Sequence, residues 1–442
     1  MRLSSEVLRL AVPSILANIT VPLVGMVDIA IAGHLSAGYS SAALIGGISI
    51  GTMLFDLLYW NFGFLRTGTG GLTAQAFGRG GKGVGSILSR ALRIALLSGL
   101  GLIAIQMLVV WLAFLVVPCS PEVRELATQY FYIRIWAAPA TLSLFALKGW
   151  FIGMQDSVRP MTADLLVNGV NIGASLLLSL GLPGLFGGMG FAGIALGTVI
   201  AQWSGFLYAM IAIRRRYRGV FVRGKKPERQ QRSFFALNRD LFLRSIGMMA
   251  VYIGFTVISA GFGDVMLAVS TILMKLLMLF SYFTDGFAYA AEALTGRFIG
   301  EKSADGLRSA VRYSFLWSGV VAALFMLLYG FGGTWLFSLM TSSDAVIDAG
   351  AAYLPWLLLM PVVGCPAFVW DGVYIGATAS AALRNSTLLC AAGFFAVWFL
   401  GRCFFPSEGL ALHVLMAAYF MHLVIRSVYQ TLGRRAVFPK VQ

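Results

Sequence analysis

Long apolar stretches separated by short polar segments run through the whole chain. Residues 91–117 and 314–340, for example, are predominantly apolar over their full length, and a helix needs roughly 20 such residues to cross a bilayer. The strands of a membrane β-barrel would instead alternate apolar and polar residues over about ten positions. The pattern therefore predicts an all-α polytopic membrane protein.

Breaks at glycine, proline and clustered charges divide the apolar sequence into twelve segments. The twelve predicted transmembrane helices lie near residues 9–34, 41–66, 86–117, 123–147, 161–181, 190–213, 241–262, 265–296, 309–338, 345–370, 382–401 and 409–428. Six precede and six follow a basic cytoplasmic linker over residues 214–238. The predicted domains are therefore an N-lobe (residues 1–213) and a C-lobe (residues 239–442).

The two lobes also share weak sequence similarity. A shift of 222 residues aligns Gly78 with Gly300 and Arg90 with Arg312. Because six crossings return the chain to its starting side, both lobes have the same topology and are related by an axis along the membrane normal. The sequence thus predicts two pseudo-symmetric six-helix bundles around a central cleft, an arrangement that works by alternating access.

Composition supports the membrane assignment, and charge adds an orientation. Hydrophobic residues make up 59% of the chain and charged residues 12%, about half the charged share of a soluble protein. The 33 Lys and Arg residues exceed the 18 Asp and Glu residues by 15, but they lie between apolar stretches, so no nucleic-acid partner is expected. If the N-terminus is cytoplasmic, the inner segments collect nearly all of them, Arg244 and Arg426 included. The five placed elsewhere are Arg66, Arg124, Arg134, Lys275 and Arg402. This asymmetry predicts a multi-pass protein of the cell inner (plasma) membrane with both termini cytoplasmic.

Motifs of other protein classes are missing from the sequence. Its three histidines form no HExxH motif, and its four cysteines form no CxxC pair. Metal sites and metal-dependent hydrolases need such spacings. We therefore predict no enzyme, no metal site and no cofactor.

Ionisable residues inside predicted helices are functional candidates, because each costs at least about 2.5 kcal/mol to insert. Asp28 lies in the first apolar segment, and we interpret its carboxyl group as a proton or cation site. A structural aspartate hydrogen-bonded to a neighbouring helix is the alternative. Pro13, earlier in the same segment, leaves a backbone carbonyl unpaired and is a predicted hinge.

Four further acidic or basic positions carry predictions about the C-lobe and the gates. Asp285 and Glu292 are seven residues apart and therefore lie on one face of a helix, which must look inward; structural, gating and transport roles remain open. Asp56 and Lys275 are predicted to pair across the cleft on the outer side, unless Lys275 extends to the interface and Asp56 binds local hydroxyls.

A second opposite-charge pair occupies equivalent positions of the repeat near the cytoplasmic side. Lys148 opens the sequence KGWFIG and Asp371 opens DGVYIG. We predict either an inner contact between these two side chains or separate interfacial positions for them.

Several segments together resemble one transporter family. They are NITVPLVGMVDIA (residues 18–30), GHL (33–35), FLR (64–66), LTAQAFG (72–78), GWFIGMQ (149–155), DGFAYAAEA (285–293) and DGVYIGAT (371–378). The chain is similar over its whole length to the DinF branch of the multidrug and toxic compound extrusion (MATE) family.

This resemblance implies a MATE-fold antiporter, monomeric in the lipid bilayer, that exports drugs or toxic organic compounds, often cationic, in exchange for protons or sodium ions. It implies that Asp28 takes the coupling ion, that the first helix bends at Pro13, and that a polar cluster falls on Asn171, Ser175 and Thr198. Ser175 stands where many members of the family carry an aspartate, which favours a proton over sodium at Asp28. Protonation of Asp28 from outside would then let the first helix repack and release the drug.

Two other functions remain as alternatives. A flippase for lipids or lipid-linked precursors shares this kind of architecture, and fold alone does not fix the substrate. Such a protein is expected to need a more cationic cavity, whereas the sequence places acids there with Lys275 as the exception. A channel or receptor is disfavoured by the duplicated lobes with inward charges.

Overall fold

The computed structural model describes residues 2–35, 39–117, 119–182, 186–218, 228–341 and 343–438. In these ranges twelve helical spans are long and apolar enough to cross a membrane, which confirms the predicted all-α polytopic architecture. The helices are α1 (Arg2–His34), α2 (Ser41–Trp60), α3 (Phe64–Gly78), α4 (Val84–Ala104), α5 (Gln106–Val116), α6 (Pro121–Arg134), α7 (Ala138–Gly153), α8 (Val158–Leu180), α9 (Phe191–Arg216), α10 (Glu228–Ala260), α11 (Asp264–Gly300), α12 (Ala304–Met340), α13 (Asp344–Ala351), α14 (Leu354–Gly376), α15 (Ser380–Phe404) and α16 (Ala411–Leu432). Short 3-10 turns cover Ile135–Ala137, Glu408–Leu410 and Gly433–Ala436.

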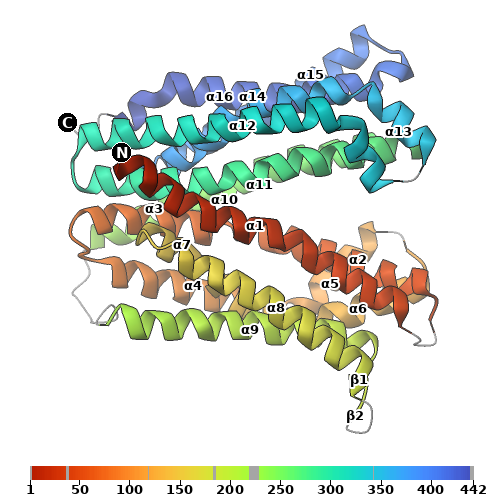
Figure 1. Ribbon diagram of the computed structural model, residues 1–442. Coiled ribbons are helices and arrows are strands. Elements are labelled where there is room, and N and C mark those ends of the chain that lie inside the picture. The colour runs from red at the N-terminus through yellow and green to blue at the C-terminus, as the bar shows by residue number, and fades with distance from the viewer. Residues whose placement is uncertain are drawn as a thin grey trace.

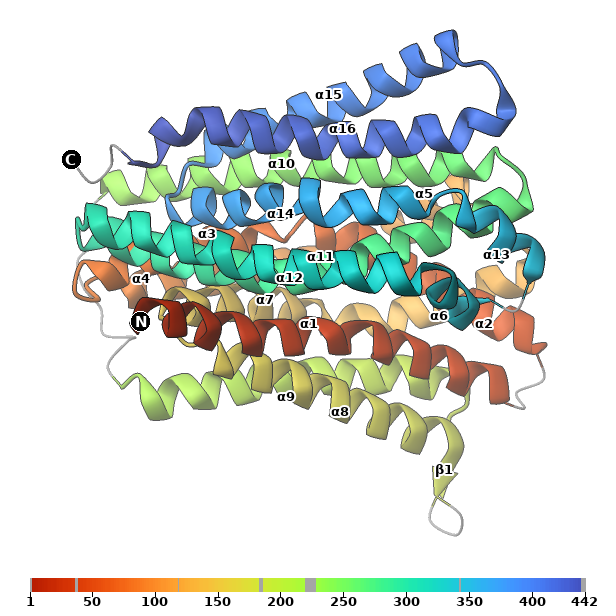
Figure 2. The same cartoon turned by 45° about the horizontal axis from the view of Figure 1, so that its top comes forward.

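The helices form two bundles, with α1 to α9 in the N-lobe and α10 to α16 in the C-lobe (Figure 1). Both termini lie at the same end of the molecule in the two ribbon views (Figures 1 and 2). An antiparallel pair of two-residue strands, β1 (Gly181–Leu182) and β2 (Phe186–Gly187), projects from the opposite end. The ends of the bundle are therefore distinct, and we call them the terminal end and the hairpin end.

Short polar residues start several of the helices. Ser40 accepts a hydrogen bond from the Ala43 amide at the start of α2, and Ser303 does the same for Gly306 at the start of α12. Such caps satisfy amides that have no partner within the helix. α1 is helical from Arg2 to His34 with Pro13 and Pro22 inside it, so the hinge at Pro13 stays a prediction.

The predicted linker is only partly described. α9 continues to Arg216, and α10 already begins at Glu228, so residues 228–238 are helical. Residues 219–227 lie outside the described ranges.

Glycines bring the two lobes into close contact near the terminal end. A Cβ atom on Gly71 of α3 would lie 2.2 Å from the backbone oxygen of Ile375 in α14, and one on Gly78 would lie 2.0 Å from that of Arg297 in α11. Any larger residue would therefore push the helices apart. We call this contact between α3, α11 and α14 the inter-lobe seam.

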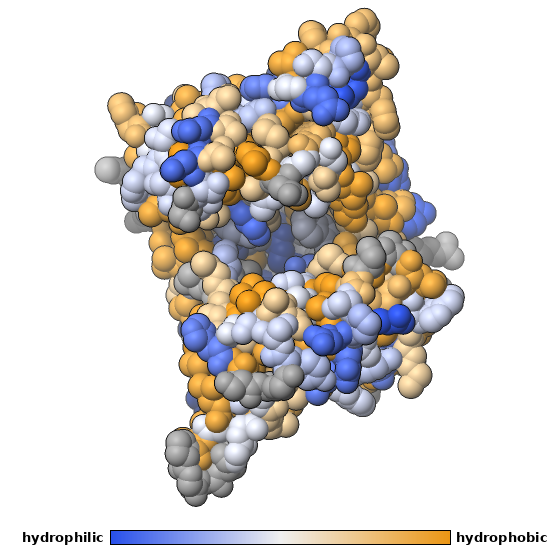
Figure 3. All heavy atoms as spheres, turned by 90° about the vertical axis from the view of Figure 1, so that its right-hand side faces the viewer, coloured by the Kyte–Doolittle hydropathy of each residue, from blue (hydrophilic) through white to orange (hydrophobic). Residues whose placement is uncertain are grey.

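At the hairpin end the lobes separate. The space-filling view from that end shows a recess between the upper and lower halves, with hydrophilic residues at its floor (Figure 3). The molecule is thus closed toward its termini and open on the opposite face.

Candidate functional site

A cavity of about 400 Å³ lies between the lobes. Its N-lobe wall comes from α2 and α3, and its C-lobe wall from α10, α11, α14 and α16. Five aromatic side chains form part of the wall, those of Trp60, Tyr252, Tyr282, Tyr289 and Phe368, as expected for a pocket that binds apolar ligands. The charged residues that line it are Arg66, Arg244, Asp285, Glu292, Asp371 and Arg426.

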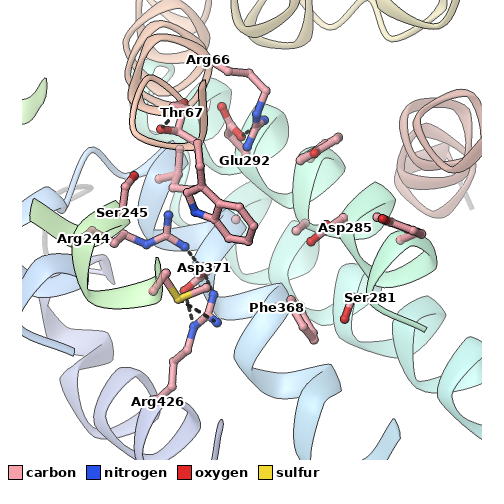
Figure 4. Close-up of a pocket in the computed structure, with 18 of the residues that line it drawn as sticks. Arg66, Thr67, Arg244, Ser245, Ser281, Asp285, Glu292, Phe368, Asp371 and Arg426 are labelled. Carbon is pink, nitrogen blue, oxygen red and sulfur yellow. Dashed lines mark hydrogen bonds and ion pairs between the residues drawn. The ribbon is translucent and has the colours of Figure 1, made fainter. Parts of the chain in front are cut away.

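Asp371 lies between two arginines on the C-lobe wall. Its carboxylate forms ion pairs with Arg244 of α10 and Arg426 of α16, and the Arg426 Nε atom donates to Oδ1 at 3.0 Å. The Gln430 side-chain amide donates to the same oxygen at 2.7 Å. Figure 4 shows the two guanidinium groups converging on this carboxylate. Two positive charges thus share one negative charge, and the buried Arg244 Nε atom has no hydrogen-bond partner among the described residues.

Glu292 joins the two lobes at the top of the cavity in Figure 4. The Arg66 Nη1 atom of α3 lies 3.4 Å from its Oε2 atom, and the Arg66 guanidinium stacks 4.2 Å from the ring centre of Tyr289. A Cβ atom on Gly70 would lie 1.9 Å from the Glu292 Oε1 atom, so α3 can pass this side chain only with glycine there. Glu292 therefore belongs both to the cavity and to the inter-lobe seam.

Asp285 faces the cavity from α11, across from the two arginines (Figure 4). Among the described residues it has no ion pair, although Arg66, Arg244 and Arg426 act on it electrostatically. Asp285 and Glu292 both line the cavity from one face of α11, where the sequence places them.

The structure brings the four predicted N-lobe site residues together. Asp28 of α1 is buried and interacts with the Ser175 hydroxyl of α8. One turn away on α8, Asn171 donates to the Thr198 hydroxyl of α9 at 3.0 Å. One oxygen of Asp28 and one of Asn171 have no hydrogen-bond partner among the described residues. The cluster can therefore accept a proton or a further ligand.

Arg134 of α6 is a positively charged residue that acts electrostatically on this cluster. It acts on both Asp28 and Asp56, and it donates hydrogen bonds to Thr52 and Tyr130 at 3.3 and 3.1 Å. Arg134 lies outside the predicted cytoplasmic segments, and the sequence predicts no role for it.

The two predicted gate pairs do not form in this structure. Lys148 pairs with Asp164 on the neighbouring helix α8, while Asp371 pairs with Arg244 and Arg426. Each side chain finds a partner inside its own lobe, which the repeat alignment could not indicate. No ion pair joins Asp56 to Lys275 in the described part of the chain, although Lys275 and Arg134 both act on Asp56 electrostatically.

Arg244 and Arg426 are site residues that the sequence analysis missed. Both arginines are assigned to cytoplasmic segments when positive charge is counted by side, so the predicted cavity is acidic with one lysine. In the structure three arginines and three acids line the cavity. The signal was available, because both arginines fall inside predicted spans, 241–262 and 409–428, where ionisable residues face the protein interior.

Comparisons with known proteins agree with this fold. The MatE family pattern matches residues 13–177 and 241–404. The DNA damage-inducible protein F of Escherichia coli K12 is 34% identical over 421 residues, which cover 91% of this chain and 90% of that protein. A probable multidrug resistance protein NorM of Caulobacter vibrioides is 27% identical over 393 residues, or 86% of this chain and 78% of that protein.

Solved structures share the fold at low sequence identity. A crystal structure of a MATE protein in the bent conformation matches with a TM-score of 0.84 at 17% identity, covering 99% of this chain and 95% of that one. A MOP superfamily transporter from Pyrococcus furiosus, described as having a binding pocket of reverse polarity, matches with a TM-score of 0.81 at 17% identity. The matched region covers 99% of this chain and 96% of the Pyrococcus furiosus chain.

Proposed function

The chain belongs to the MatE family, whose members are transporters and not enzymes, and on this premise we propose that it is a proton-coupled antiporter. It exports organic, often cationic compounds by alternating access. It works as a monomer in the cell inner membrane with both termini in the cytoplasm, so that the open face of the cavity looks outward.

The observation that carries this proposal is the buried carboxyl group of Asp28 with one unpartnered oxygen. A buried charge without a partner is expensive, so a carboxylate in this position needs a proton or a cation. Hard metal ions prefer several oxygen ligands, carboxylates among them. The side chains clustered with Asp28 are the hydroxyls of Ser175 and Thr198 and the amide of Asn171, all uncharged. A single proton satisfies Asp28 without further ligands.

Proton binding can drive export only if it changes the relative free energies of the two conformations. Asp28 sits on α1, which contacts both the N-lobe helix α8 and the C-lobe helix α11; the Asn18 amide, for instance, donates to the Tyr282 carbonyl at 3.2 Å. Arg134 acts electrostatically on Asp28, and a proton on the Asp28 carboxylate removes that attraction between α6 and α1. α1 then repacks about Pro13, and the change reaches the C-lobe through α11.

A flippase for lipid-linked precursors is the second candidate. The sequence predicts an acidic cavity, which disfavours this function, whereas the arginines that line the cavity favour it. A pyrophosphate group would find Arg244 and Arg426 on one wall. It would also meet Asp285 and Glu292 on α11, and like charges at close range in a cavity repel strongly. Export of smaller organic compounds therefore fits the cavity better.

The test is uptake of a fluorescent organic cation into proteoliposomes under an imposed pH gradient and, separately, a sodium gradient. Wild type, Asp28→Asn and Asp305→Asn are compared; Asp305 has 98% of its side chain exposed and serves as the matched control. We expect uptake driven by the proton gradient in wild type and control, and none in Asp28→Asn. Uptake that follows only the sodium gradient, or that persists in Asp28→Asn, would overturn the assignment of the ion or of its site.

A further inference from the structure

The cavity is neutral overall but carries separated charges. Its three arginines balance its three acids when all are ionised. The charges are not evenly paired, because Arg66 and Glu292 face each other while Asp371 takes both Arg244 and Arg426. One wall therefore carries an excess positive charge, which we call the arginine pole.

Arg244 is the part of the arginine pole that is available to a ligand. Its side chain is 15% exposed, against 3% for Arg426. Its Nε atom is buried without a partner, although Nη2 binds Asp371. A guanidinium group has a planar edge of donors that matches a carboxylate, and unsatisfied buried donors are unfavourable until a ligand arrives.

The excess negative charge lies on α11. Asp285 lines the same cavity, has no ion pair among the described residues, and is separated from Arg244 and Arg426 across the open space (Figure 4). Aromatic side chains also line the cavity, including Trp60, Tyr252 and Phe368. The cavity thus offers a cation site, an anion site and an apolar wall at once.

We propose that this cavity selects amphipathic zwitterions, with Arg244 binding the carboxylate of the substrate and Asp285 binding its cationic group. This inference rests on the proposed export function and specifies its substrate class. A simple cation would satisfy Asp285 and leave the arginine pole uncompensated. A simple anion would satisfy the arginine pole and leave Asp285 uncompensated. A zwitterion satisfies both poles, and it enters the cavity without changing the net charge there.

The matched probes are rhodamine B, which carries a free carboxylate beside its cationic ring system, and rhodamine B methyl ester, which keeps only the cation. Binding to purified protein is measured by fluorescence anisotropy and transport in proteoliposomes. Wild type is compared with Arg244→Gln, Arg244→Lys, Asp285→Asn and the control Arg239→Gln, an exposed arginine on the same helix. Asp371 keeps Arg426 and Gln430 as partners in the Arg244 variants, so the fold is preserved.

We expect wild type and Arg239→Gln to bind rhodamine B about tenfold more tightly than the ester, since a hydrogen-bonded charge pair is worth roughly that factor. Arg244→Gln loses this preference, because it weakens binding of rhodamine B but not of the ester, whose cation no longer meets the positive charge of Arg244. Arg244→Lys retains part of it, because the charge remains but the planar fork does not. Asp285→Asn weakens binding of both dyes.

Equal affinity of wild type for the two dyes, no binding of either dye, or an equal effect of Arg244→Gln on both would overturn the inference. The export function is tested separately by transport. If the protein binds rhodamine B preferentially but moves neither dye under any ion gradient, the proposed export function fails while the zwitterion site stands. If both dyes are transported without discrimination, the export function stands and the inference fails.

Discussion

The Gln75 side-chain amide of α3 donates a hydrogen bond to the Gly376 carbonyl of α14 at 2.9 Å, and so ties the N-lobe to the C-lobe across the inter-lobe seam. The same amide donates to the Thr378 hydroxyl at 3.1 Å. Gln155, just after the end of α7, donates a comparable hydrogen bond from its side-chain amide to the Ala293 carbonyl of α11 at 2.8 Å. Closure at the terminal end therefore depends on side-chain amides that bind the backbone of the opposite lobe. These bonds must break before the cavity can open toward the termini.

Gln75→Leu should shift the protein toward a form that is open at the terminal end. The substitution removes two hydrogen bonds worth about 1 kcal/mol each, which together correspond to a change of roughly thirtyfold in the equilibrium between the closed and open forms. Spin labels at the exposed positions Lys82 and Lys302 report the separation of the lobes at that end. We expect more long distances in Gln75→Leu than in Ser86→Ala, which removes a local hydrogen bond to Gly83. Identical distance distributions in the two variants would argue against this role for Gln75.

Gly71→Ala should prevent the seam from closing, because the added Cβ atom would meet the Ile375 oxygen at 2.2 Å. Overpacking of this kind costs about 1–3 kcal/mol. We expect a lower melting temperature and reduced transport. Gly101→Ala is the matched control, since a Cβ atom there has nothing within 4 Å. A melting temperature as high as that of the control would mean that the helices can separate freely at Gly71.

Asp371→Asn should destabilise the protein far more than loss of the Lys148 to Asp164 ion pair. It leaves two arginines without their counter-charge, and breaking a buried pair costs about 3–5 kcal/mol. Asp164→Asn removes one partner of an ion pair whose side chains are about one-fifth exposed, where a smaller effect is expected. Thermal unfolding of the two variants in detergent gives the comparison. Equal losses would show that Asp371 is not needed to compensate the arginine pole.

Ser175→Asp should make transport respond to a sodium gradient. The new carboxylate would stand beside Asp28, and two carboxylates with the hydroxyl of Thr198 and the amide of Asn171 offer the oxygen ligands that a hard cation needs. Ser175→Asn has the same size without the charge and is the control. Transport is measured under sodium and proton gradients in turn. Unchanged proton coupling in Ser175→Asp, with no response to sodium, would contradict this view of the cluster.

The twelve spans and their grouping could be predicted because lipid contact leaves a long apolar signature. The signal weakens where a helix packs only against protein. The second predicted span ends at residue 66, whereas the structure continues through α3 to Gly78. That segment is rich in glycine and threonine and is buried in the inter-lobe seam, so it needs no apolar surface.

The candidate site was predictable in part for a related reason. Carboxylates inside apolar segments stand out, and Asp28, Asp285 and Glu292 were found in this way. Partners are set by tertiary packing, which sequence spacing does not encode. Lys148 and Asp371 have opposite charges at equivalent repeat positions, yet each binds a side chain on a helix of its own lobe. Arg244 and Arg426 were missed because a count of positive charge by side treats an arginine near a helix end as solvated.

Glu292 couples ligand recognition to the inter-lobe seam, which closes the cavity toward the terminal end. Its side chain lines the cavity and faces Arg66 of the other lobe, while its backbone oxygen lies against Gly376 in the seam. A compound that bridges Arg66 and Glu292 without drawing either away from the other would fasten the lobes together. Such a compound would act as an inhibitor, and tight occupancy at this point would slow turnover instead of increasing it.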